Sequence, residues 1–291
     1  MGTRGLEAFD LFYGEMYKER WACLKESLSA PKKHVAILNP HSGFEFPTEG
    51  PMLNGLSFKH QIQDSFPHPE KTTLGYMNYY LMDAASIMAV EALDPRPGER
   101  VVDLCAAPGG KSFLCALKMQ NQGLLISNDR SASRRARIHR IFEDYIPKTL
   151  QTNHKVTSFD ASKWCLYEKN LYDKVLLDAP CSSERHVLDD PKELALWALG
   201  RTKALAVSQF AMLASALDIV KVGGTVVYST CALSRLENDD IIDKLYKKRG
   251  GRFEVISKTF PIGEKTEHGW QILPDREGWG PFYLTVVKKL K

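Results

Sequence analysis

Residues 101–112 read Val-Val-Asp-Leu-Cys-Ala-Ala-Pro-Gly-Gly-Lys-Ser: an apolar run, a carboxylate and then a glycine-rich bend. The apolar run predicts a strand that ends at Asp103, and the pattern from Lys111 to Lys118 predicts the start of a helix. A strand–turn–helix of this kind brings bare backbone N–H groups close to a ligand. The bend therefore predicts a binding loop for a nucleotide phosphate or for an adenosyl cofactor.

Two known phosphate-binding signatures do not fit this bend. The Walker signature requires a glycine five residues before Gly110, where this chain has Cys105. The dinucleotide fingerprint requires three glycines, and only Gly109 and Gly110 are present. Taken alone, the stretch is equally consistent with a purely structural strand–turn–helix, so the rest of the chain must decide.

Helical and extended patterns alternate along the chain after residue 100. Five strands are predicted, at 101–105, 124–128, 154–158, 174–178 and 225–230. Helices are predicted between them, with a last helix from Asn238 to about Lys248 and two final strands near 252–257 and 282–288. This alternation predicts an α/β fold with a mostly parallel sheet, helices on both faces and a ligand site at the carboxyl ends of the strands.

The first 73 residues follow a different pattern. Apolar side chains recur three or four positions apart at Phe9, Tyr13, Tyr17, Trp21, Leu24 and Leu28. They predict one amphipathic helix over residues 5–30, ended by Pro31, with its aromatic face toward the core. Residues 39–73 are rich in proline and glycine and predict an irregular arm, and residues 76–93 predict a helix. We therefore divide the chain into an N-terminal helix and arm, residues 1–73, and a main domain, residues 74–291.

Composition restricts the class of protein. The chain has 291 residues and a net charge of +4, which permits a polyanionic partner without requiring one. Its six cysteines have no paired short spacing, so we expect neither a metal site nor a disulfide framework. We expect the protein to be in a reducing compartment. No apolar run approaches the roughly 18 residues that a membrane span needs, so we expect no membrane partner.

Three motifs, in this order, resemble the signatures of the Sun-domain family of S-adenosylmethionine-dependent RNA (cytosine-5) methyltransferases. They are Asp-Leu-Cys-Ala-Ala-Pro-Gly-Gly-Lys at 103–111, Asp-Ala-Pro-Cys-Ser at 178–182 and Tyr-Ser-Thr-Cys at 228–231. The resemblance implies a class I methyltransferase (Rossmann-like) fold. This fold has a seven-stranded mostly parallel sheet whose closing strand runs antiparallel, here with a small N-terminal helical appendage. The implied cofactor is S-adenosyl-L-methionine, bound by residues 74–291.

Four acids end successive predicted strands, at Asp103, Asp129, Asp160 and Asp178. Asp129 is placed to accept hydrogen bonds from both ribose hydroxyls, as an acid does at this place in a Rossmann unit. Each acid alone is also a common turn cap. The resemblance adds Arg134 and assigns Asp160 to the adenine amino group. The predicted cofactor-binding residues are Cys105, Ala106, Ala107, Pro108, Gly109, Gly110, Lys111, Asp129, Arg134, Asp160, Ala161 and Asp178.

Two cysteines follow predicted strands on polar turns, Cys181 and Cys231. Methylation of cytosine at C5 needs such a group, because C5 attacks a methyl group only after a nucleophile has added to C6. Cysteine is a good nucleophile and leaving group, and its pKa can be tuned near neutrality. The other candidates, Cys105, Cys115 and Cys165, are interpreted as small buried hydrophobes.

The resemblance assigns roles to these side chains. Cys231 corresponds to the nucleophile of Sun-domain RNA enzymes and Cys181 to the residue that assists release, whereas DNA cytosine methyltransferases attack with the cysteine of the Pro-Cys motif. Asp178 is placed to help the addition near cytosine N3 if it is protonated or shares a proton. Lys111 would support the cofactor or the cytosine O2. Ser234-Arg235-Leu236-Glu237 matches a capping box, which gives Glu237 a structural role.

Basic residues predict an RNA-binding face, although a solvated helix surface is the commonest origin of such a pattern. Five arginines lie in eleven residues, at Arg130, Arg134, Arg135, Arg137 and Arg140. Four basic residues after Cys181 are predicted to hold the target strand through phosphates: Arg185, His186, Arg201 and Lys203.

The motifs look most like the mitochondrial ribosomal-RNA branch of the family. This implies methylation of a cytosine in ribosomal RNA, of the mitochondrial small subunit, by a monomer that a helper RNA-binding protein directs. Transfer RNA is the alternative substrate, and a non-catalytic ribosome-assembly factor that binds cofactor and RNA is the alternative class. Glu7 and Asp10 are unlike an intact mitochondrial presequence. We expect a mitochondrial protein, with the cytoplasm or nucleus as the alternative.

Overall fold

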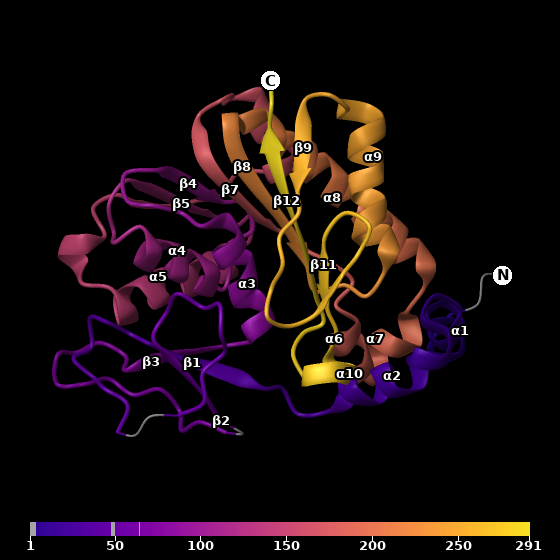
Figure 1. Cartoon of the computed structure of the whole chain (residues 1–291), viewed down its shortest axis with the longest axis horizontal. Helices are drawn as coiled ribbons and strands as arrows, with labels where there is room; N and C mark the ends of the chain where they lie inside the picture. The colour runs from indigo at the N-terminus through magenta and orange to yellow at the C-terminus, as the bar shows by residue number, and fades with distance from the viewer. Residues whose placement is uncertain (1–3, 48–49, 64) are drawn as a thin grey trace.

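The computed structural model describes residues 4–47, 50–63 and 65–291 (Figure 1). Residues 48, 49 and 64, within the predicted arm, and residues 1–3 lie outside the described part. A nine-stranded sheet forms the centre, in the order β10-β11-β12-β8-β7-β4-β5-β6, with β9 paired to β12. Its strands are β4 (Arg100–Asp103), β5 (Leu124–Asn128), β6 (His154–Thr157), β7 (Tyr172–Asp178), β8 (Val220–Thr230), β9 (Phe253–Ile256), β10 (Glu264–Lys265), β11 (Trp270–Ile272) and β12 (Phe282–Lys289).

The seven strands predicted from the sequence are all present. Strands β6, β5, β4, β7 and β8 run parallel, and β12 pairs antiparallel with β8, from Tyr283 opposite Thr230 to Lys288 opposite Thr225. The predicted α/β sheet with an antiparallel closing strand is confirmed. Strands β10 and β11 were not predicted, because two or three residues are too few to show a period in the sequence.

Helices cover both faces of this sheet (Figure 1). One face packs against α3 (Ala84–Leu93), α4 (Gly110–Lys118) and α5 (Ala132–Tyr145), and the other against α8 (Leu199–Ile219) and α9 (Asp239–Arg249). Neighbouring strand residues point to opposite cores, as Val101 and Val102 do, because side chains alternate along a strand. Within the described ranges, none of the helices has the length and apolarity to cross a membrane.

The N-terminal helix predicted over residues 5–30 is broken. It forms α1 (Leu6–Tyr17), the 3₁₀ helix η1 (Lys18–Arg20) and α2 (Trp21–Ser29), and Lys18 has a positive φ of 51°. The predicted burial of the aromatic face is confirmed, since Phe9 and Tyr13 are both fully buried. This face packs with Trp197, Leu233 and Leu273 of the main domain, near the short helices α6 (Glu184–Asp189), α7 (Pro191–Leu196) and α10 (Pro274–Glu277) (Figure 1).

A second, three-stranded sheet flanks the predicted irregular arm, in which, among the residues that the structure describes, only 60–63 form a strand. It has the antiparallel order β2-β1-β3, formed by β1 (His34–Leu38), β2 (His60–Gln63) and β3 (Tyr79–Met82). The helix predicted over residues 76–93 is therefore wrong before residue 84. Asp83 caps α3 by accepting a hydrogen bond from Ala85 N at 2.8 Å. These strands were missed because β1 finds its partners 20 or more residues away, where local sequence patterns give no signal.

Candidate active site

The glycine-rich bend connects β4 to α4 as predicted. Gly109 has a positive φ of 119°, which glycine adopts without strain, and α4 begins at Gly110. A Cβ on Gly110 would lie 2.6 Å from the Tyr80 hydroxyl and from Met82 Cε, so these two side chains of β3 would have to move. The small sheet therefore supports the binding loop.

A cavity of ≈ 520 Å³ opens beside this loop. Five of the predicted cofactor-binding residues line it: Cys105, Asp129, Arg134, Asp160 and Ala161. The buried Asp129 accepts a hydrogen bond from Ser131 N at 2.9 Å, and Arg134 Nη2 lies 3.4 Å from Asp129 Oδ2. Arg134 also donates to Ala107 O at 2.8 Å, which ties α5 to the loop.

The lining of this cavity combines acids with apolar side chains. Phe159, Leu205 and Met212 face it together with the two carboxylates of Asp129 and Asp160. Carboxylates can accept hydrogen bonds from the hydroxyls of a ribose and from the amino group of an adenine, and apolar walls can pack against the adenine ring. The side chains that line this cavity therefore fit an adenosyl cofactor. Phe159 and the residues from α8 were not predicted, because they belong to none of the three motifs.

A second cavity of ≈ 340 Å³ holds three more of the predicted residues, whereas Cys181 and loop residues 106–110 line neither cavity. Cys231, Lys111 and Asp178 line it, from three different elements of the chain. Its remaining lining includes Lys32, Asp83, Ser183, His186 and Phe282. Ser183 was within reach of sequence reasoning, since it is two residues from Cys181. Lys32 and Phe282 come from distant segments that carry no motif.

The two cysteines of the motifs are in contact. Cys181 Sγ lies 2.9 Å from Cys231 Sγ and accepts a hydrogen bond from Cys231 N at 3.3 Å. Ser183 Oγ lies 3.1 Å from Cys231 Sγ. The bond from Cys181 and that from Ser183 lower the pKa of the Cys231 thiol, although burial raises it. The bond with Cys231 and burial hold the pKa of Cys181 well above its usual value. The pair therefore favours a thiolate at Cys231 and a thiol at Cys181.

Lys111 and Asp178 form a partly buried ion pair beside the cysteines. Lys111 Nζ donates to Asp178 Oδ2 at 2.8 Å, and Ser229 Oγ donates to Asp178 Oδ1 at 2.8 Å. Burial lowers the pKa of Lys111, but the Asp178 carboxylate outweighs it, so the net pKa is raised. Both oxygens of Asp178 accept hydrogen bonds from these donors. Lys111 is a hydrogen-bond donor at the second cavity, and the role of Asp178 near cytosine N3 stays a prediction.

A family model matches most of the chain. The model of the family described as 16S rRNA methyltransferase RsmB/F matches residues 90–288. The chain belongs to this RsmB/F family. The resemblance to the Sun-domain enzymes is thereby confirmed, together with the class I, Rossmann-like fold.

Individual relatives of this RsmB/F member differ in their named RNA. The chain is 44% identical over 245 residues to "5-cytosine rRNA methyltransferase NSUN4" of Xenopus tropicalis, which covers 78% of this chain and 60% of that relative. It is 31% identical over 316 residues to "tRNA (cytosine(34)-C(5))-methyltransferase, mitochondrial" of Mus musculus, which covers 98% and 90%. The chain spans 60% to 63% of the length of the two frog relatives that it matches.

Solved structures show the same fold. A methyltransferase homologue from Pyrococcus horikoshii superposes with a TM-score of 0.78 at 22% identity, covering 98% of this chain and 95% of that one. The structure described as NSun6 from the same organism with SFG gives a TM-score of 0.76 at 19% identity, with 97% of both chains covered.

One of the four strand-end acids lies outside both cavities of this RsmB/F chain. Asp103 is buried beneath the loop, and its Oδ2 accepts from Ser112 Oγ at 2.7 Å. Its Oδ1 has no hydrogen-bond partner within the part of the chain that the structure describes. Burial, above all, raises the pKa of Asp103 to about 7. Asp129 and Asp160 line the first cavity and Asp178 lines the second. The four acids therefore lie at three different places: the first cavity, the second cavity and the buried position beneath the loop.

The predicted phosphate contacts differ in their availability. Arg185 is buried and donates to Ala30 O at 3.0 Å and to Gly280 O at 3.1 Å, so it ties the N-terminal segment to the main domain. It also lines the second cavity, and its contact with phosphate stays a prediction. Arg135 donates to the backbone oxygens of Asp129 and Arg130. His186 lines the second cavity.

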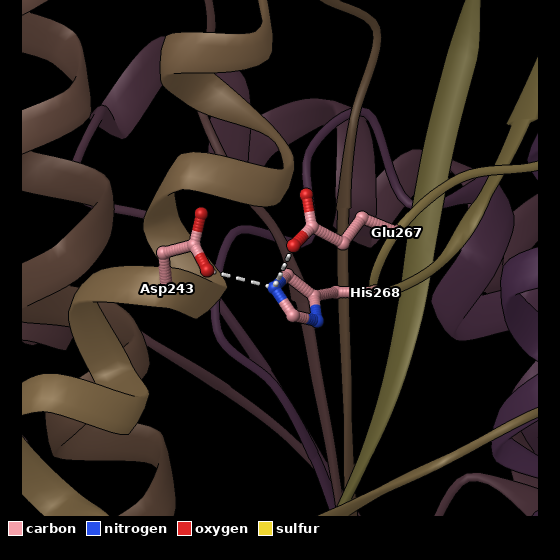
Figure 2. A group of neighbouring side chains, drawn as sticks. All are labelled: Asp243, Glu267 and His268. Carbon is pink, nitrogen blue, oxygen red and sulfur yellow. Dashed lines mark hydrogen bonds and ion pairs between the residues drawn. The ribbon is translucent and has the colours of Figure 1, made fainter.

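A histidine and two acids gather on the surface away from both cavities. Figure 2 shows His268 between Asp243 and Glu267, with His268 Nε2 at 2.8 Å from Asp243 Oδ1 and 3.8 Å from Glu267 Oε1. Arg235 Nη2 already lies 2.6 Å from Glu267 Oε2 and 3.4 Å from Asp243 Oδ2. This cluster is therefore an ion-pair network in which an arginine supplies the positive charge.

Proposed function

We propose that this protein is an S-adenosylmethionine-dependent RNA (cytosine-5) methyltransferase that acts on ribosomal RNA. The observation that carries the proposal is the contact between Cys181 and Cys231 at 2.9 Å, at the edge of the cavity that also holds Lys111 and Asp178. The lowered pKa of the Cys231 thiol fits a nucleophile, and the raised pKa of the neighbouring Cys181 thiol fits a partner that handles a proton. Family membership and the names of the relatives support the same chemistry.

The first cavity is our candidate site for the cofactor. S-adenosylmethionine supplies a methyl group on a sulfonium when it is bound. Asp129 would accept hydrogen bonds from the ribose hydroxyls, and Asp160 would accept one from the adenine amino group. The loop residues Ala106, Pro108, Gly109 and Gly110 would place backbone groups against the cofactor.

The second cavity is our candidate site for the flipped cytosine. The Cys231 thiolate would form a bond to C6 of the cytosine. The electron pair of the C5–C6 double bond would shift toward C5, which could then attack the methyl group. Lys111 would donate a hydrogen bond to the ring as negative charge develops there. Removal of the C5 proton would then restore the double bond and return the S–C6 pair to Cys231. Cys181 would assist that step, as a base or by positioning one.

The substrate that we propose is ribosomal RNA of the mitochondrial small subunit. We propose that the protein acts on it in mitochondria, as a monomer, together with a helper protein. The relatives at 44% identity are named for rRNA. Transfer RNA is the second candidate, because a mitochondrial tRNA enzyme matches 98% of this chain.

The test is in vitro methylation of small-subunit rRNA and of mitochondrial tRNA transcripts, with 5-methylcytidine measured by mass spectrometry of nucleosides. We expect 5-methylcytidine in rRNA and its loss with Cys231→Ala. Product in tRNA alone would favour the second candidate. Cofactor binding without any product, also in the presence of ribosomal precursor particles, would favour the non-catalytic assembly factor.

A further inference from the structure

Two glutamates lie behind the cysteine pair, away from both cavities. Glu184 begins α6, and Glu237 ends the 3₁₀ helix η4 (Arg235–Glu237). Both side chains are fully buried, at 0% exposure. Neither carboxylate has an ion-pair partner within the part of the chain that the structure describes, so hydrogen bonds alone must stabilise them.

The hydrogen bonds of Glu184 come from two distant segments. Its Oε1 accepts from the Tyr13 hydroxyl of α1 at 2.5 Å, and its Oε2 accepts from Leu233 N at 2.9 Å. Glu237 Oε1 accepts from Ser182 N at 3.0 Å and from Gln209 Nε2 at 2.8 Å. The capping box predicted for Glu237 is therefore incomplete, because its side chain points to the cysteine loop instead of its own helix start.

One hydroxyl connects the two glutamates. Ser182 Oγ forms hydrogen bonds both to Glu184 Oε1 and to Glu237 Oε2. A hydroxyl has one proton to donate, so it can serve only one carboxylate, and the other carboxyl group must donate to Ser182. Both oxygens of Glu184 already accept from other donors, whereas Glu237 Oε2 contacts only Ser182. Proton counting therefore places the extra proton on Glu237 Oε2.

We propose that Glu237 donates a proton to Ser182, that Ser182 donates in turn to Glu184, and that the two glutamates act as positioning residues for the two cysteines. The inference deepens the proposed function and rests on it for the roles of the cysteines. Ser182 directly follows Cys181 in the chain, so its bonds fix one side of the pair. Gln209 adds to this by donating to Pro180 O at 2.9 Å.

The segment that follows Cys231 is held by hydrogen bonds to Glu184 and to α1. Leu233 lies two residues after Cys231, and its N–H donates to Glu184 Oε2. Tyr17 of α1 donates to Leu233 O at 2.8 Å. The N-terminal helix thereby contributes Tyr13 and Tyr17 to the support of the cysteines, which explains why its aromatic face is buried in the main domain.

The surroundings of Glu237 favour the proton that its hydrogen bonds place there. Burial and the charge of Glu184 raise the pKa of Glu237 to about 7, so it holds a proton well above the usual range of a glutamate. The titratable groups that interact with Glu237 are Glu184, Tyr13 of α1 and Tyr228 of β8. Burial raises the pKa of both tyrosines, which keeps them neutral.

The single proton makes the two glutamates unequal, and this can be tested. Glutamine at position 237 keeps an oxygen for the bonds from Ser182 N and Gln209, and its amide can donate to Ser182 Oγ as the protonated acid does. Glutamine at position 184 places an NH₂ group against a donor, since both carboxylate oxygens there accept. Glu237→Gln should therefore be tolerated, and Glu184→Gln should be damaging.

The measurement is the rate at which iodoacetamide alkylates Cys231 in the full-length protein without RNA, mapped by peptide mass spectrometry from pH 6 to 9. The rate follows the thiolate fraction, so it reports how well the pair is positioned. We expect Glu237→Gln to stay within about twofold of the wild type at pH 7 and Glu184→Gln to fall by about tenfold or more. Glu26→Gln, on an exposed position of α2, is the matched control and should change nothing.

Equal effects of Glu184→Gln and Glu237→Gln would overturn the proposal. If Glu184→Gln does not fold, infrared spectroscopy tests the proton directly. The wild type should show protonated carboxylic C=O absorption at neutral pH, to which Asp103 also contributes, and Glu237→Gln should remove the part that belongs to Glu237. An identical spectrum would overturn the proposal. Neither measurement requires methyl transfer, so an inactive wild type that still shows the asymmetry would refute the proposed function alone.

Discussion

At the scale of single residues, the cysteine pair gives the sharpest prediction. Because the pKa of Cys231 is lowered and that of Cys181 is raised, Cys231→Ala should form no covalent adduct with RNA. Cys181→Ser should permit addition and methylation but slow the release, so a protein–RNA adduct should accumulate on denaturing gels. An adduct with Cys231→Ala and none with Cys181→Ser would reverse the two roles.

Asp129 allows a separate test of the first cavity. Its carboxylate is buried and lies 3.4 Å from Arg134, so a ribose that binds it would gain charge-assisted hydrogen bonds. Asp129→Ala should weaken S-adenosylmethionine binding by about 1–3 kcal/mol in calorimetry. Lys163→Ala, outside both cavities, serves as the control. Unchanged affinity of Asp129→Ala would place the ribose elsewhere.

Glu237 should also shape the pH dependence of stability. Its pKa is about 7 in the folded protein and near 4.5 in the unfolded chain, so the folded state binds the proton more tightly. The free energy of unfolding should therefore fall as pH rises from about 4.5 to about 7, by up to about 3 kcal/mol from this group. Urea unfolding should show a shallower fall in Glu237→Gln. Parallel pH profiles of the two proteins would contradict the raised pKa.

At the scale of elements, the loop before α4 depends on the small sheet. A Cβ at Gly110 would lie 2.6 Å from Met82 Cε and from the Tyr80 hydroxyl, both on β3. Gly110→Ala should cost about 1–3 kcal/mol of stability, measured by urea unfolding, because the neighbours must shift. Gly200→Ala is a matched control on α8, where nothing lies within 4 Å, and it should be neutral or slightly stabilising. An equal response of both variants would show that β3 can move away freely.

At the scale of the whole molecule, the N-terminal helices share a core with the main domain. Phe9 is fully buried against Trp197, with ring centroids 5.3 Å apart. Phe9→Ala should lower the midpoint of a single unfolding transition by an amount equivalent to about 3–5 kcal/mol, whereas Leu11→Ala, at a position 66% exposed, should change it little. A separate, earlier transition in Phe9→Ala would show that the division near residue 73 separates two folding units. That division otherwise stays a prediction.

Local patterns were sufficient to predict seven of the nine strands of the main sheet, the glycine-rich loop and the pair Cys181 and Cys231. A buried parallel strand is a continuous apolar run, and a motif is contiguous in the chain, so both are visible in the sequence alone. The burial of Phe9 and Tyr13 was visible for the same reason, since their spacing follows the period of a helix.

Only the tertiary structure decided the contacts between distant segments. The pairing of β1 with β3, the approach of Tyr80 to Gly110 and the commitment of Arg185 to backbone oxygens all join segments far apart in sequence. The same holds for the proton between Glu184 and Glu237, which are 53 positions apart by their numbers. A pKa and a hydrogen bond depend on burial and on the neighbouring atoms, and these are set by packing of the whole chain rather than by local residue order.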